Sequence, residues 1–342
     1  MKEVKSQKMT TINQSIPSNL KNILTRYHGA NPLKAWWEIL SAFIPFGLGW
    51  LLMVWSLQYP YPITLLLAIV PSAFLLRIFS IQHDCGHYSF FASKRSNDIL
   101  GVICSLLTLT PYHYWLRSHA YHHTHVCNLD FQKTGYVKLK SVDGFLRSTP
   151  VEKLLYRIYR SPIVLFFFGP PLQFLILQRL TYRIAPSWTK ERRWVHLTNG
   201  LILLICLPLV WAIGWQNFLL VELPIVWITA CLGVWLFYVQ HTFEDTYFSG
   251  DENWDWLKSS LEGSSHYDLP VLFHFFSGNT GFHHIHHLDS LIPNYSLRDC
   301  YHQNPDLQIG RKVSLLQSLQ SIPLSLWDEN QQKLVSFEEV TP

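Results

Sequence analysis

The chain lacks the residue patterns that mark disulfide scaffolds, zinc knuckles and the common nucleotide cofactors. Its six cysteines are scattered without a CxxC pair, so we expect reduced thiols. No HExxH motif and no glycine-rich flavin or nicotinamide fingerprint occurs, which argues against a zinc hydrolase and a resident dinucleotide. No small-residue cleavage site precedes the first apolar run, so we expect no secretory signal peptide.

Charge is also scarce, at 15% of the residues, and it is unevenly distributed. Long apolar blocks contain almost no charge, and the charged residues are concentrated between them. This distribution is typical of a multispanning membrane protein, and the 14 Trp and 16 Tyr fit interfacial belts. The net charge of +4 is modest and identifies no partner by itself.

Four apolar runs are predicted to cross the bilayer as helices, at residues 40–57, 63–81, 197–213 and 218–239. Two shorter runs are not. Residues 99–110 are too few to cross a hydrocarbon core that requires about 20 helical residues. Residues 163–177 are broken by Gly169-Pro170-Pro171 and flanked by arginines, so we interpret them as interfacial or re-entrant.

The loops differ in charge, which predicts their side of the membrane. Residues 131–160 carry seven Lys or Arg, whereas the turns at 58–62 and 214–217 carry none. By the positive-inside rule the basic stretches, the histidine clusters and both termini are cytoplasmic. We therefore predict an all-α integral membrane protein with four transmembrane helices and a cytoplasmic helical cap.

Three parts of the chain are expected. Residues 1–38 form a basic interfacial arm with a short helix at 16–27 on the membrane surface. Residues 39–300 form the membrane domain. Residues 301–342 form a cytoplasmic tail with an amphipathic helix at 313–326.

Three histidine clusters stand out in the polar stretches: His83-Asp84-Cys85-Gly86-His87, His119-Ala120-Tyr121-His122-His123 and His283-His284-Ile285-His286-His287. On a helix, positions i, i+3 and i+4 share a face. Three imidazoles of each later cluster can therefore point at a common place, and the first cluster adds two at i and i+4. Eight imidazoles are too many for one tetrahedral zinc but suit two transition-metal ions. We therefore expect a dinuclear metal centre.

Helical spacing alone does not settle every ligand. His284 shares a face with two neighbours in its cluster, and His125 lies about one step around the helix from His122. His241 directly follows the last apolar run and is a candidate ninth ligand, with a polar helix cap as the alternative. The spacing therefore predicts the site but leaves its full ligand set open.

Other polar residues near the clusters fit supporting or structural roles. A metal-bound imidazole usually hydrogen-bonds through its second nitrogen, although a place in a turn is the simpler explanation for an Asp or Asn. The candidates for this supporting role are Asp84, Asn128, Asp130, Glu244 and Asn279. We expect His113, His266 and His274 on the surface.

The three clusters, with two spans before the first and two between the last ones, resemble the histidine boxes of the membrane-bound fatty acid desaturases. The resemblance covers about residues 35–300. Two stretches, 240–245 (QHTFED) and 278–288 (GNTGFHHIHHL), are most similar to bacterial desaturases that act on acyl chains of membrane lipids. A third box that begins with His instead of Gln argues against the front-end subgroup.

The resemblance implies two Fe ions (Fe2+), with O2 as co-substrate. The implied ligands are His83, His87, His119, His122, His123, His283, His286 and His287, with His241 matching an additional histidine that follows the last span in relatives. Those relatives carry an asparagine one turn before that histidine, whereas this chain has Phe237. Asn279 is a candidate substitute.

The implied reaction inserts a cis double bond into a lipid acyl chain, using two electrons from outside. Removing hydrogen from an unactivated methylene needs a strong oxidant, which a di-iron centre can form from O2. An apolar tunnel would determine which carbon pair reacts, because it holds one pair next to the metal centre. The chain has no His-Pro-Gly-Gly haem motif. The expected partners are therefore an acyl lipid, the bilayer and a separate ferredoxin or b-type cytochrome, and no nucleic acid.

Two other readings share part of this pattern. Related membrane hydroxylases or ketolases, acting on a lipid or carotenoid, share the boxes and the metals, and product analysis separates them from a desaturase. A metal transporter would need polar ligands midway through its spans. The charged residues of these spans, Arg77 and Glu222, lie near the ends instead.

Overall fold

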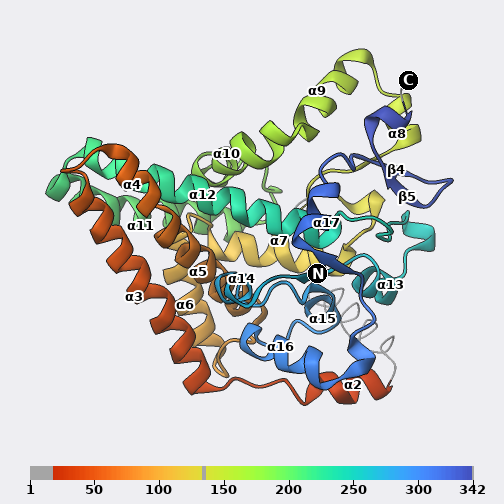
Figure 1. Ribbon diagram of the computed structural model, residues 1–342, viewed down its shortest axis with the longest axis horizontal. Coiled ribbons are helices and arrows are strands. Elements are labelled where there is room, and N and C mark those ends of the chain that lie inside the picture. The colour runs from red at the N-terminus through yellow and green to blue at the C-terminus, as the bar shows by residue number, and fades with distance from the viewer. Residues whose placement is uncertain (1–17, 133–135, 341–342) are drawn as a thin grey trace.

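The computed structural model describes residues 18–132 and 136–340, and most of them are helical. Long apolar helices lie together at one end of the molecule, and short helices with two small sheets form the other end (Figure 1). We call the second part the cap. The all-α prediction holds for the membrane part, whereas the cap also contains five strands of two or three residues among the described residues.

Four helical segments are each long and apolar enough to cross a membrane, and they lie where the sequence predicts the four spans. They are α3 (Pro32–Ser56), α4 (Tyr61–Leu67) together with α5 (Ile69–His87), α11 (Thr189–Ile213) and α12 (Trp215–His241). Each helix is longer than its apolar run. As a result α5 includes the whole first histidine box, and α12 ends on His241.

Local residues explain where these helices begin and end. The side chain of Asn31 accepts a hydrogen bond from the backbone of Lys34 at 3.1 Å, which caps the start of α3. Tyr88 ends α5 in the left-handed conformation, one residue after the first box. Gly214, at φ 81°, is the single residue between α11 and α12, a conformation that only glycine adopts without strain.

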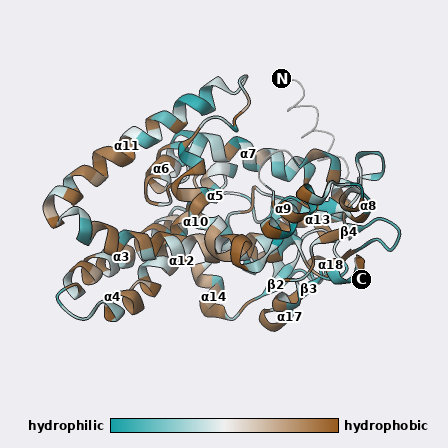
Figure 2. Cartoon of the chain, turned by 90° about the horizontal axis from the view of Figure 1, so that it is seen from above, coloured by the Kyte–Doolittle hydropathy of each residue, from teal (hydrophilic) through white to brown (hydrophobic). Residues whose placement is uncertain are grey.

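The long helices consist largely of apolar residues over most of their length (Figure 2). On α11, Leu204 and Trp211 are 68% and 90% exposed, and the described residues bury little of this helix. Exposed apolar side chains on a helix of this length are favourable in lipid and unfavourable in water. The surface of the helical end therefore fits a bilayer.

Two further helical pairs bend sharply. The first, α6 (Lys94–Leu107) and α7 (Tyr112–His125), meets at 104°. The second joins α9 (Pro150–Arg160) to the segment Val164–Arg179, which contains α10 (Gly169–Leu175), and bends by 58°. By length, composition and bend, each pair is either one broken span or a re-entrant segment. The hairpin of α11 and α12 ends beside the second box, where His241 meets His122.

The cap contains the remaining elements. Its helices are α2 (Ser18–Thr25), α8 (Val142–Leu146), α13 (Trp256–Leu261), α14 (Val271–Phe276), α15 (His283–Leu288), α16 (Asn294–Gln303), α17 (Leu315–Gln320) and α18 (Phe337–Val340). One sheet has the order β1 (Lys140–Ser141), β4 (Leu326–Asp328), β5 (Lys333–Val335), and the other pairs β2 (His266–Asp268) with β3 (Lys312–Ser314).

Two sequence predictions about the ends of the chain need correction. The amphipathic helix predicted at 313–326 is present only as α17, and its predicted extent is wrong because strands β3 and β4 include the two ends of that range. Both strands pair with distant segments, so local spacing could not reveal them. The helix predicted at 16–27 is present as α2, with its first two positions outside the described residues. Leu20 and Leu24 of α2 are buried in the cap core with Phe282 and Ile285, so they do not face lipid.

Candidate metal centre

Nine histidines from four helices converge in two groups at the junction of the spans and the cap. The first group contains His83 and His87 of α5, His119 and His123 of α7, and His286 of α15. The second contains His122 of α7, His241 of α12, and His283 and His287 of α15. Within each group the candidate ligand atoms lie within 4.8 Å of one another. These nine are the residues that the sequence and the resemblance singled out.

Each of the two later boxes is divided between the groups. The expectation that three imidazoles of a box meet at one point is therefore wrong. Residues i and i+4 lie about 40° apart around a helix, whereas residue i+3 lies about 60° to the other side of residue i. In α7, His119 and His123 accordingly share one group while His122 belongs to the other. In α15 the i, i+4 pair is in the second group, and His286 reaches the first.

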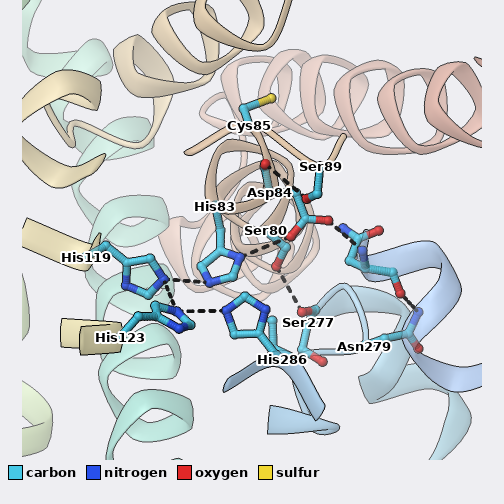
Figure 3. A network of polar contacts seen from close by, with 12 residues as sticks. Ser80, His83, Asp84, Cys85, Ser89, His119, His123, Ser277, Asn279 and His286 are labelled. Carbon is cyan, nitrogen blue, oxygen red and sulfur yellow. Dashed lines mark hydrogen bonds and ion pairs between the residues drawn. The ribbon is translucent and has the colours of Figure 1, made fainter. Parts of the chain in front are cut away.

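The nitrogen positions in the first group fit a shared cation. The Nε2 atoms of His83 and His119, of His119 and His123, and of His123 and His286 are each 3.0 Å apart (Figure 3). A ring nitrogen has one proton or one lone pair, so a nitrogen with two such neighbours completes only one linear hydrogen bond. Two nitrogens bonded to one ion at right angles, at about 2.1 Å, lie about 3.0 Å apart. The spacing therefore matches ligands of one metal ion.

The second group has the same spacing. The Nε2 atoms of His122 and His241 lie 3.2 Å apart, and those of His241 and His283 and of His283 and His287 lie 3.0 Å apart. Among the described residues, neither group includes a carboxylate or a thiol. An all-imidazole donor set suits transition metals such as iron, zinc and copper, and does not suit Ca²⁺ or Mg²⁺.

Burial keeps the cap histidines in the form that binds metals. Desolvation lowers the pKa of His283, His286 and His287 well below the usual histidine value, and neighbouring imidazoles lower it further. These rings are therefore neutral at neutral pH, and a neutral ring keeps a lone pair free for a metal.

In the hydrogen bonds of the described residues, two of the nine rings are oriented through their second nitrogen. Nδ1 of His83 lies 3.1 Å from Oδ1 of Asp84, whose Oδ2 accepts a 2.6 Å hydrogen bond from the backbone N–H of Asn294 (Figure 3). Nδ1 of His241 donates to the carbonyl of Gly263 at 2.9 Å. Such partners select the tautomer and leave Nε2 unprotonated. Asp84 was predicted in this role, whereas Gly263 and Asn294 act through backbone atoms and carry no side-chain signal.

The other predicted supporting residues lie elsewhere. Asn128 donates to Asp251 at 3.1 Å, and Asp130 accepts from the backbone of Asp251 at 2.8 Å, so both stabilise a loop of the cap. Glu244 is exposed. Asn279 donates to the carbonyl of Asn294 at 3.1 Å. None of these four contacts a histidine of either group in the described hydrogen bonds.

Phe237 lies beside the second group. Its ring centroid is 5.4 Å from that of His122 and 5.7 Å from that of His241. The three residues line a cavity of about 30 Å³, which Tyr136 and Arg160 also line. Phe237 therefore presents an apolar ring, and not an amide, to this side of the centre.

The histidines that spacing left open lie outside both groups. His284 donates from Nε2 to the carbonyl of Leu307 at 2.9 Å, and Nδ1 of His125 lies 3.0 Å from the carbonyl of Tyr121. Spacing could not exclude them, because both share a helix with true group members.

The prediction that His266 and His274 lie on the surface is wrong. They are 3% and 6% exposed, and both rings stack on Phe282, at centroid distances of 4.9 Å and 4.8 Å. Burial lowers the pKa of His266 to about 3 and that of His274 to about 4. His113 is half-buried against Trp194. All three are structural in this fold.

Comparison with known proteins matches this architecture. A family model described as fatty acid desaturase matches residues 56–309, a range that includes all nine histidines. A fatty acid desaturase of Bacillus subtilis is 44% identical over 303 residues, which cover 89% of this chain and 86% of that protein.

More distant relatives carry more specific names. An sn-1 oleoyl-lipid 12-desaturase of Synechocystis sp. is 26% identical and covers 78% of this chain and 74% of its own. A chloroplastic omega-6 fatty acid desaturase of Brassica napus is 25% identical over 89% of this chain and 68% of its own. The family model matches most of the chain, and the Bacillus subtilis relative is similar over nearly its whole length. The chain, with its two histidine groups, therefore belongs to the fatty acid desaturase family.

Proposed function

We propose that this protein is an O2-dependent fatty acyl desaturase that inserts a cis double bond into an acyl chain of a membrane lipid. Two irons would be held by His83, His87, His119, His123 and His286 and by His122, His241, His283 and His287. The observation that carries the proposal is the convergence of nine buried or half-buried imidazoles into two groups, in a chain of this family.

When bound, the two irons would let O2 accept two external electrons, two protons and two hydrogen atoms from adjacent methylenes, giving a double bond and two water molecules. The chain's own residues hold the imidazoles neutral, fix their orientation and exclude solvent. Asp84 and the Gly263 carbonyl orient two rings. The second group is wholly buried, which keeps competing water away from it.

A lipid substrate is supported by two observations. The described spans present apolar side chains outward, so the acyl chains of the bilayer lie directly against the protein. The Synechocystis relative is named for an oleoyl lipid. A hydrophobic path from the bilayer would present one carbon pair to the centre by position, because the chemistry of neighbouring methylenes is nearly identical.

The electrons would come from a separate ferredoxin or b-type cytochrome on the cytoplasmic side. The sequence contains no flavin, nicotinamide or haem-binding motif that could supply them. Basic residues gather near the predicted cytoplasmic ends of α11 and α6, including Lys190, Arg193 and Lys94, where an acidic donor protein would be attracted.

The proposal is tested by the fatty acid methyl esters of a host that expresses the chain together with a matched ferredoxin. Gas chromatography and mass spectrometry should show a new double bond with the unmodified chain. The His119→Ala variant should lose at least about 100-fold of this product, since a ligand itself is removed. His113→Ala is the matched control, because His113 lies outside both groups, and it should retain activity.

The chemical identity of the product also distinguishes a desaturase from the related membrane hydroxylases. If the product is a hydroxylated acyl chain without a new double bond, the centre is a hydroxylase and not a desaturase. A new double bond formed equally by the His119→Ala variant would contradict the assigned site. Purified protein that binds no iron under reducing conditions would contradict the di-iron centre.

A further inference from the structure

Trp115 is in ring contact with two of the first-group histidines. It lies on α7 one turn before His119, and its indole stacks on that imidazole at a centroid distance of 4.5 Å and an interplanar angle of 17°. The same indole lies 5.6 Å from the ring of His83 on α5. One aromatic side chain therefore touches candidate ligands from two helices.

Among the described residues His119 has no hydrogen-bond partner at Nδ1, a feature that it shares with His122, His283 and His287. It differs from them in the indole stacked parallel on its ring. Nδ1 of His83 is held by Asp84 and that of His241 by the Gly263 carbonyl. In the hydrogen bonds of the described residues, His119 takes part only through Nε2, with His83 and His123. A histidine ligand without a second-nitrogen partner is oriented by the groups that pack against its ring. The parallel indole of Trp115 is the flat surface that supplies it.

Gly86 makes room for this indole. Gly86 lies on α5 inside the first box, directly before His87. A Cβ atom at this position would lie 2.6 Å from Cζ3 of Trp115, a distance at which one of the two must move. Phe79 of α5 packs edge-on against the indole at a centroid distance of 5.7 Å, so the Trp115 ring is also held from this side. The first box thus has a glycine at the point where the indole meets α5.

We propose that Trp115 is a positioning residue of the metal centre. Seated against Gly86, its indole holds the His119 ring beside His83, so that the first group retains its metal ion. The inference rests on the proposed di-iron function and adds an assignment of two residues that are not ligands. It concerns the first group alone, because among the ring contacts of the described residues Trp115 reaches no histidine of the second group.

The test measures iron release from purified, iron-loaded protein in detergent with a competing chelator, followed by absorbance. His87→Ala and His283→Ala, which remove one ligand from the first and the second group, identify the two release phases. Trp115→Leu should weaken only the first-group ion, by about 10- to 100-fold, the usual effect of losing a residue that orients a ligand. Trp115→Phe retains an aromatic face and should recover much of the loss.

Two further variants separate positioning from general packing. Gly86→Ala should reproduce the selective loss with only one added methyl group, and Gly86→Ala combined with Trp115→Leu should bind the first ion better than Gly86→Ala alone. Trp235→Leu, which removes a half-buried indole packed on Phe166, should leave both phases unchanged. If Trp115→Leu does not fold, the glycine variants and Trp115→Phe decide the question.

The outcomes are distinct. Selective loss of the first-group ion with rescue in the double variant supports the inference. Unchanged release of both ions from Trp115→Leu and Gly86→Ala, or equal loss of both, overturns it. An unmodified chain that binds no iron overturns the proposed function itself, and this shows as the absence of both phases.

Discussion

A difference of one residue decides which group a histidine joins. His122 and His123 are neighbours, yet they point about 100° apart around α7 and belong to different groups. In the described structure the i, i+4 pairs of all three boxes stay together, and the i+3 members cross to the other group. The spacing of the boxes is therefore suited to two metal positions side by side. Three imidazoles that all pointed at one place could bind only one metal ion.

The buried His274 makes the stability of the protein sensitive to pH. Its pKa is lowered by burial to about 4, whereas in the unfolded chain it is about 6.5. The unfolded state binds the extra proton first as the pH falls, so stability present above pH 6.5 is lost between pH 6.5 and about 4. At pH 5 this loss is about 2 kcal/mol.

Replacing His274 by Phe keeps a flat ring against Phe282 and removes the titration. We expect the variant to lose less thermal stability than the unmodified protein between pH 7 and pH 5, measured by melting in detergent. The matched control is His196→Phe, which changes an exposed histidine of α11 and leaves the His274 ring and its neighbours in place, so the pH dependence should stay unchanged. Equal pH dependence in the His274→Phe variant and the unmodified protein would show that this ring is not the source.

At the scale of elements, the bend between α6 and α7 brings the second box to the first. Gly101 of α6 lies against the ring of Tyr112, where a Cβ would overlap that ring. Tyr112 in turn donates a 2.8 Å hydrogen bond to the carbonyl of Cys85, inside the first box. The close approach of α6 thus determines where α7, and with it His119, stands relative to α5.

Gly101→Ala should therefore destabilise the protein by about 1–3 kcal/mol, because the rigid Tyr112 ring has to move. Desaturation should fall with it, since the second box moves with α7. Gly47→Ala in α3 is the matched control, because a Cβ there meets nothing within 4 Å. That change should be neutral or stabilising by about 0.5–1 kcal/mol. Similar melting temperatures for the two variants would contradict the role of this contact.

At the scale of the whole molecule, four spans place all nine histidines at one end. The positive-inside rule predicts a cytoplasmic position for that end, because residues 131–160, which follow the second box, carry seven Lys or Arg. This topology predicts that each of the two bent pairs is re-entrant and returns to the side from which it entered.

Reporter fusions test this topology. Alkaline phosphatase, active only outside the cytoplasm, should be active when inserted at residues 58–60 or at Gly214. It should be inactive at Ser148 or after residue 342, where a green fluorescent protein fusion should fluoresce. Phosphatase activity at Ser148 would mean that the segment before it crosses the membrane, and the proposed arrangement would fail.

Much of this protein is determined by the sequence alone, because the signals are local. Apolar runs define the four spans, and histidine spacing along single helices locates the three boxes, within which the family resemblance names the eight residues that the structure brings together. Lipid surroundings require continuous apolar helices, so the bilayer imposes a pattern that is readable residue by residue.

Only the tertiary structure decided the rest. The division of each box into two groups, the place of His241 and the exclusion of His125 and His284 depend on where four helices meet. The strands that bound α17 and shorten the helix predicted at 313–326 depend on pairing with segments far away in the chain. Contacts between distant segments produce no periodic pattern in the local sequence. They are determined by how the helices and strands pack in three dimensions.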